Sequence, residues 1–246
     1  MHFHVPKPLH GWREFAGEVG IIVIGVLIAL GVEQVVQTVH DRRVADESRR
    51  AINLELGEIT GDLSKRVRTE PCIVRRLNEV DTFVTAAAAG KPVKPLLWIG
   101  RPQIHTIETA AWNSASQAGR TALFTAEEQN RYANSYALVD NVGESEAREQ
   151  DVWGQLRGLE GEASVSPTEV FTIRSLVSQA RSLDWRIRIY SLQARLAAAA
   201  ENIRPVPTPH DQGSISVCVS SDTPRARAVQ IIDGPHPYVG SEFGEP

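Results

Sequence analysis

The stretch EVGIIVIGVLIALGVE, residues 18–33, places fourteen uncharged and mostly aliphatic residues between two glutamates. A helix that spans a bilayer needs about twenty apolar residues. The apolar pattern resumes after Glu33, so residues 19–39 form a run of twenty-one that contains one charge. At about 1.5 Å per residue this run is roughly 30 Å long, which is one hydrocarbon thickness. We therefore predict a transmembrane helix over residues 15–39, preceded by a short N-terminal segment, residues 1–14.

The composition of the run favours insertion into a bilayer. Thirteen of its residues are Val, Ile or Leu, which together contribute about −4 to −8 kcal/mol on insertion scales. Glu33 lies towards one edge, where an acidic residue costs less than the roughly 3 kcal/mol expected at the centre. Trp12 and Phe15 precede the run, at the level where aromatic rings favour the membrane interface. No small-x-small cleavage site follows it, so we expect an uncleaved single-pass anchor.

Small residues four apart occur twice in this helix and would let another helix approach closely. They are Ala16 with Gly20 and Gly25 with Ala29. This spacing is a weak indication of oligomerisation or of a partner helix. Glu18 and Glu33 are too far apart to touch within one chain, and we interpret them as the edges of the span rather than as a buried ion or proton site.

The stretch GEVGIIVIGVLIALGVEQ, preceded by HGWREFA, resembles the N-terminal signature of a family of uncharacterised bacterial single-pass membrane proteins. The family carries an N-terminal transmembrane segment that begins with G-E and continues to G-x-L-I-A-L. The resemblance covers residues 10–36 and becomes vague beyond them. It implies an inner-membrane protein with a helical remainder, and it supplies no catalytic residues.

After the span, apolar residues recur at helical spacing and predict a helical bundle over residues 40–203. We expect the membrane helix to continue outward, to break near Pro71 and to be followed by a second helix over residues 72–89 that stops at Gly90. The expected inner positions of these two helices are Ile52, Leu56, Ile59, Leu63, Ile73, Leu77, Val80 and Val84.

Capping signals predict the later helices. Thr125 and Glu128 form a T-x-x-E box that opens a long helix to about residue 157, and Ser166 and Glu169 open another. Between residues 91 and 106 the chain is proline-rich and apolar, which predicts an ordered connection packed through Leu96, Leu97 and Trp98, followed by a short helix near residues 107–119. The predicted inner residues are Tyr132, Tyr136, Val139 and Trp153 in the first long helix, and Ile173, Leu176, Ala180, Leu183, Ile187, Tyr190, Ala194 and Ala197 in the second.

From residue 204 the composition changes, and half of the fourteen prolines follow. We predict a Pro-rich irregular tail over residues 204–246, with a short helix near PRARAVQIID and a short extended piece at SISVCVS. The fold class is thus all-α: one transmembrane helix that continues into an extramembrane antiparallel bundle of long helices, with an irregular C-terminal tail.

Two observations bear on the orientation in the membrane, and they favour opposite sides. Four arginines at positions 42, 43, 49 and 50 follow the span, against Lys7 and Arg13 before it, which favours a cytoplasmic bundle. Cys72 and Cys218 are the two cysteines, and a disulfide between them would tie the tail to the bundle in an oxidising compartment. Two unrelated buried thiols are the alternative. We expect a periplasmic bundle anchored in the bacterial inner membrane.

No catalytic or cofactor motif is present: the chain lacks a phosphate loop, a dinucleotide fingerprint, a G-x-S-x-G elbow and a C-x-x-C pair. His2 and His4 lack the further ligands that a metal site needs. Glu144, Glu146 and Glu149 are interpreted as a hydrated helix face. Several aromatic residues are predicted to be core, with a pocket between helices as the alternative. They are Trp112, Tyr132, Tyr136, Trp153, Trp185 and Tyr190.

The sequence therefore favours a non-enzymatic, membrane-anchored scaffold or accessory subunit that binds a second copy or a membrane-protein complex. The small net charge of −4 gives no basic stripe for nucleic acid. No cofactor is expected, and the lipid bilayer is the first partner. A periplasmic, sensor-like domain that binds a ligand between its helices is the alternative function. An enzyme with an unrecognised site is the remaining one.

Overall fold

The computed structural model describes residues 11–105, 107–206 and 216–233. These ranges contain helices and connections and no β-strand, which confirms the all-α prediction. The helices are α1 (Trp12–Ala88), α2 (Ala110–Gln117), η1 (Arg120–Leu123), α3 (Ala126–Leu156), η2 (Arg157–Leu159), α4 (Pro167–Ala200) and α5 (Arg225–Asp233). His2, His4, the rest of the first ten residues and residues 234–246 of the predicted tail lie outside the described ranges.

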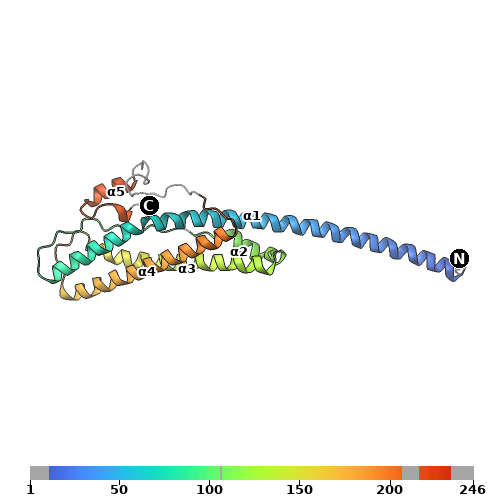
Figure 1. Ribbon diagram of the computed structural model, residues 1–246, viewed down its shortest axis with the longest axis horizontal. Helices are drawn as coiled ribbons and strands as arrows, with labels where there is room; N and C mark the ends of the chain where they lie inside the picture. The colour runs from blue at the N-terminus through green and yellow to red at the C-terminus, as the bar shows by residue number, and fades with distance from the viewer. Residues whose placement is uncertain (1–10, 106, 207–215, 234–246) are drawn as a thin grey trace, which may run out of the picture.

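One continuous helix joins the apolar N-terminal run to the bundle. With 77 residues α1 is about 115 Å long, and Figure 1 shows its N-terminal part projecting far beyond the other helices. Where side chains are described, no residue of α1 before Ala45 is buried. Among the described helices, α1 is the one whose length and apolar composition would allow it to cross a membrane.

The predicted break at Pro71 is wrong, because α1 continues through this residue to Ala88. A proline inside a helix removes one hydrogen bond and costs about 3 kcal/mol. Here Pro71 lies on an exposed side of the helix, while Cys72, Ile73 and Leu77 are buried directly after it. Burial of these apolar residues offsets the lost bond. The helix ends where predicted, before Gly90, whose φ of 66° suits a glycine.

Three long helices form the bundle. α3 begins beside Arg49 of α1, which pairs with Glu128, and its last turns share a core with residues 72–84 of α1. α3 therefore points the same way as α1. α4 returns in the opposite direction and packs against both, so it is the antiparallel member of the bundle (Figure 1).

The predicted core positions of α1 and α3 are all buried. Both capping boxes are also present: the side chains of Thr125 and Ser166 accept bonds from the backbone N–H groups of Glu128 and Glu169. In α4 the predicted seam faces the core, although Leu183, Tyr190 and Ala197 are only half-buried. Helical periodicity and capping residues thus positioned these helices correctly.

Two segments without long helices pack on the bundle. Residues 89–109 run back from the end of α1 to the start of α2, with Leu96 and Trp98 buried as predicted. Part of the predicted tail is also packed, since Val217 and Ala228 are fully buried. The extended piece predicted at SISVCVS is wrong for its described residues, because residues 216–218 form a 3-10 turn. The helix predicted near PRARAVQIID is present as α5.

The chain crosses α1 at two glycines when it leaves α4. The backbone N–H of Val206 donates to the carbonyl of Gly57 at 2.8 Å. A Cβ added at Gly61 would overlap the carbonyl oxygen of Val206, and one at Gly57 would lie 3.0 Å from the carbonyl oxygen of Arg204. Glycine is therefore required at position 61 for the close approach of two backbones.

We predict that Gly61→Ala lowers the free energy of unfolding by about 1–3 kcal/mol, because residues 204–206 must move away from α1. Chemical denaturation of the full-length protein in detergent micelles would measure this. Gly154→Ala in α3 is the matched control, since its added Cβ meets no atom within 4 Å, and helix propensity should stabilise it by up to about 1 kcal/mol. Equal effects of the two substitutions would contradict the role of the crossing.

Candidate functional site

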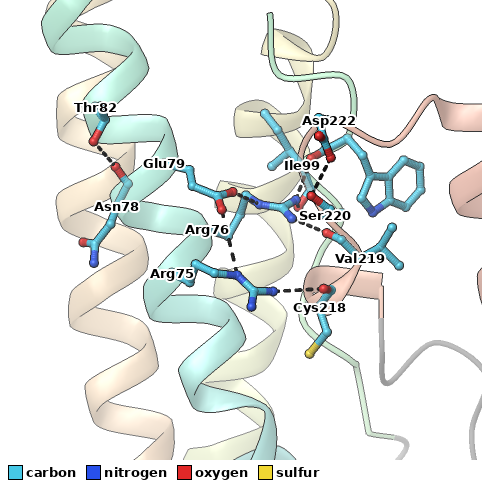
Figure 2. A network of polar contacts seen from close by, with 12 residues as sticks. Arg75, Arg76, Asn78, Glu79, Thr82, Ile99, Cys218, Val219, Ser220 and Asp222 are labelled. Carbon is cyan, nitrogen blue, oxygen red and sulfur yellow. Dashed lines mark hydrogen bonds and ion pairs between the residues drawn. The ribbon is translucent and has the colours of Figure 1, made fainter. Parts of the chain in front are cut away.

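Residues 216–222, which we call the strap, are fastened to the second half of α1. The structure joins Cys72 of α1 and Cys218 of the strap in a disulfide, with the two Cα atoms 4.9 Å apart and the two residues 146 positions apart in sequence. Arg75 donates to the carbonyl oxygen of Cys218 at 2.9 Å. Arg75 and Arg76, which follow Cys72 in sequence, both extend from α1 towards the strap (Figure 2).

Arg76 is a fully buried cation that donates hydrogen bonds to backbone carbonyls of two segments. Its guanidinium donates to the carbonyls of Trp98 and Ile99 in the connection and to that of Val219 in the strap. Its Nε donates to Glu79 at 2.8 Å. Burial lowers the pKa of Arg76, and the ion pair with Glu79 opposes this effect. Guanidinium remains charged in proteins, so the site holds a compensated buried charge.

Further bonds join the strap to the connection. The indole of Trp98 donates to the carbonyl of Ser216 at 2.8 Å, and the backbone N–H groups of Leu97 and Trp98 donate to the carbonyl of Ser221. Glu160, just after η2, accepts from the backbone N–H of Ile99 at 3.1 Å. These bonds satisfy backbone groups that have no helix or sheet partner.

A groove lies on the outer side of this assembly, between the last turns of α1 and residues 92–96. Its volume is about 880 Å³. The walls are mainly apolar, with Pro71, Val74, Phe83 and Val93 among them, and the rim carries both acidic and basic side chains. A groove of this size and composition suits an apolar side chain or an apolar ligand.

A second polar cluster lies inside the bundle, between its three long helices. One nitrogen of Arg66 in α1 donates to Glu149 of α3 at 2.9 Å and to Asp184 of α4 at 2.8 Å. Nearby, Glu146 of α3 accepts from the backbone N–H of His105 and lies 2.8 Å from its Nδ1. All five side chains are buried, so this cluster connects every layer of the bundle.

The cluster carries three carboxyl groups against one guanidinium. The pKa of Glu149 is raised to about 7, chiefly by burial. The charge of Arg66 opposes this rise, and the charges of Asp184 and Glu146 add to it. The Oε2 atom of Glu149 is buried without a hydrogen-bond partner among the described residues. The raised pKa means that the protonated form of Glu149 is favoured up to higher pH than for an exposed glutamate.

The interpretation of Glu144, Glu146 and Glu149 as one hydrated face is wrong for two of them. Glu144 is exposed, whereas Glu146 and Glu149 are 1% and 0% exposed. Spacing contained the missed signal, because these two residues continue the three-and-four repeat of the apolar positions in α3. The repeat runs through Tyr132, Tyr136, Val139, Val142, Glu146, Glu149, Trp153 and Leu156.

The aromatic residues predicted to be core occupy different environments. Trp153 is fully buried, and Tyr132 and Tyr136 are buried beside the half-buried Trp112, which stacks on Tyr136. Trp185 contradicts the prediction, since 58% of it is exposed on α4. Trp112, Tyr132 and Tyr136 fill the core near α2, and the half-buried Tyr190 packs against the same cluster. Trp153 lies in the other core cluster, which includes the groove residues Phe83 and Leu96.

The four small residues predicted for helix packing, Ala16, Gly20, Gly25 and Ala29, lie along the free part of α1. A Cβ at Gly20 or Gly25 would meet no atom of this chain within 4 Å. Packing against another helix stays a prediction for this segment. In the described ranges, no group of three or more His, Cys, Asp or Glu residues is arranged to hold a metal ion.

No protein-family model, curated protein or solved structure matches this chain. The resemblance of residues 10–36 to a bacterial membrane-protein family therefore stays a prediction. The functional argument rests on the geometry of the chain itself.

We predict that replacing Cys72 and Cys218 by alanine lowers the free energy of unfolding by up to about 5 kcal/mol, the chain-entropy value for a loop of this length. The strap and α5 should then become the first part cut by trypsin, at Arg225 or Arg227, while α3 and α4 stay resistant. Limited proteolysis with mass mapping would check this. Unchanged resistance of α5 would show that Arg76 and Trp98 hold the strap without the disulfide.

Glu149→Gln should change how stability depends on pH. Between pH 4.5 and 7 the folded protein retains a proton that the unfolded chain has lost, so the wild-type chain loses stability as pH rises through this window. The variant cannot titrate there, so its stability relative to wild type should rise by about 3 kcal/mol between pH 4.5 and 8.

Denaturant titrations at several pH values would measure the difference. Glu144→Gln, on the exposed side of the same helix, is the control and should run parallel to wild type. A Glu149→Gln curve that also runs parallel would contradict the raised pKa.

Proposed function

We propose that the protein is a single-pass inner-membrane protein whose helical bundle stands in the periplasm as a non-enzymatic scaffold or accessory module. The observation that carries this proposal is the continuity of α1, whose exposed apolar N-terminal part and buried second half belong to one helix. A helix without a break connects the two parts with only the gentle curvature that long helices show. The membrane segment would thus fix the height and direction of the bundle.

The disulfide supports the periplasmic assignment. Disulfides persist in oxidising compartments and are rare in the cytosol, and here Cys72 and Cys218 join segments that are far apart in sequence. The arginines after the span favour the opposite orientation, but long domains translocate largely regardless of local charge. The four arginines at positions 42, 43, 49 and 50 also lie near acidic residues in the sequence. One of them, Arg49, pairs with Asp46 and Glu128.

The sensor-like alternative has weaker support. It was predicted from aromatic residues that would line a pocket between helices, and these residues pack in the two core clusters of the bundle or, at Trp185, lie on the surface. The groove of about 880 Å³ lies instead on the outer side of the bundle. An outer surface of this kind suits association with another protein.

We expect the protein to remain in the membrane fraction after carbonate washing of bacterial membranes. A C-terminal epitope tag should be removed by protease in intact spheroplasts, and the cysteines should resist a maleimide reagent in cells until a reductant is added. Recovery in the soluble fraction would contradict the anchor. A protected tag together with freely reactive cysteines would contradict the periplasmic orientation and leave the anchor standing.

A further inference from the structure

The groove borders a stripe of α4 that carries an exposed tryptophan. Arg181 of α4 contacts Asn78 and Asp81 of α1, and Arg188 pairs with Glu70 at 3.5 Å. Glu70 and Asn78 line the groove. Trp185 lies four residues after Arg181 and three before Arg188, so the three side chains share one stripe of the helix.

This stripe continues as an apolar surface towards the membrane. Trp185, Leu192 and Leu196 are 58%, 47% and 61% exposed, at intervals of seven and four residues that keep them on one face. Together they leave roughly 300 Å² of apolar surface open, before the groove walls are counted. An exposed apolar area of about 300 Å² is at the low end of the largest patches found on single folded proteins, which are often functional.

A lipid surface cannot cover this face. The groove begins at Glu70, thirty-one residues along α1 from the end of the apolar run at Val39. In a straight helix this separation is about 45 Å. We call the groove on α1 together with the stripe of Trp185, Leu192 and Leu196 the α1–α4 face. Its partner must therefore be a protein that reaches the same height above the membrane.

A second copy of the chain meets this requirement, because its anchor would place the same face at the same height above the membrane. The antiparallel pairs Arg181–Asp81 and Arg188–Glu70 place Trp185 level with about residue 74 of α1, and Val74 lines the groove. Two copies anchored in one membrane are parallel and at equal height. A two-fold axis along the membrane normal would then bring the tryptophan of each copy to the groove of the other.

The chemistry of the two surfaces is also complementary. A protruding tryptophan beside a mainly apolar groove is a self-complementary pair, as an isologous interface requires. The stripe and the groove together expose less than the roughly 800 Å² per partner that a stable interface in solution buries, so such a dimer depends on the anchor that both copies share.

We propose that the protein forms a parallel homodimer in the membrane through the α1–α4 face, with Trp185 of each copy packed in the groove at Val74 of the other. The inference rests on the proposed function, because the common height of the two faces comes from a shared anchor. Confinement to the membrane plane raises the effective concentration, so a modest interface suffices.

The test is photo-crosslinking of the full-length protein in native membranes. Benzoylphenylalanine in place of Trp185 should give a product of twice the monomer mass, with the crosslink mapped to peptides that contain Val74 or Val93. Trp185→Glu and Val74→Glu should each reduce dimer formation at least about tenfold, measured by energy transfer between labelled copies.

Leu54→Glu is the matched control, because Leu54 is 57% exposed on α1 outside the groove, and it should leave the dimer within about twofold of wild type. Trypsin resistance of each variant reports that the bundle is folded. A monomer that stays in the membrane fraction, or a crosslink from position 185 to a different protein, would overturn the interface and leave the anchor intact. A soluble protein would overturn the proposed function and, with it, the height argument.

Discussion

The continuity of α1 is the constraint on which the rest of the structure depends. Among its described side chains none before Ala45 is buried, whereas the turns from Ala45 onward contribute to both core clusters of the bundle. Because one uninterrupted helix contains both parts, the free segment continues directly into the core (Figure 1). Each later segment is placed by its contacts with this helix or with α4, which packs along it.

Ionic groups at core positions hold the three long helices in register. The apolar repeats of α1, α3 and α4 are interrupted at Arg66, Glu149 and Asp184, and these three side chains meet. A buried charge that lost its partners would cost several kcal/mol, so this arrangement disfavours sliding of one helix past another. The core therefore combines non-directional apolar burial with one directional contact that specifies alignment.

The strap, residues 216–222, has too few apolar residues for a core of its own and is held by its contacts with α1 and residues 89–109. Val217 and Val219 are buried only because the disulfide, Arg76 and the Trp98 indole bring this segment to α1. Its presence also shapes the outer surface, because Ser221 and residues 92–96 form one side of the groove. A tail segment thus completes the surface that we propose for dimerisation.

Periodicity and capping chemistry were sufficient to predict the all-α class, the apolar N-terminal helix, both capping boxes and nearly all core positions, because these depend on neighbours within a few residues. Local rules failed at Pro71, where burial of the following residues outweighs the lost hydrogen bond, and at Glu146 and Glu149, where composition suggested a hydrated face. Trp185 was assigned to the core by its residue type, although its position on α4 is outside the buried seam. The sequence by itself determined the helices and the apolar run. Tertiary structure alone decided which charges meet, where the strap lies and which tryptophan stays exposed, because these depend on contacts between residues that are up to 146 positions apart.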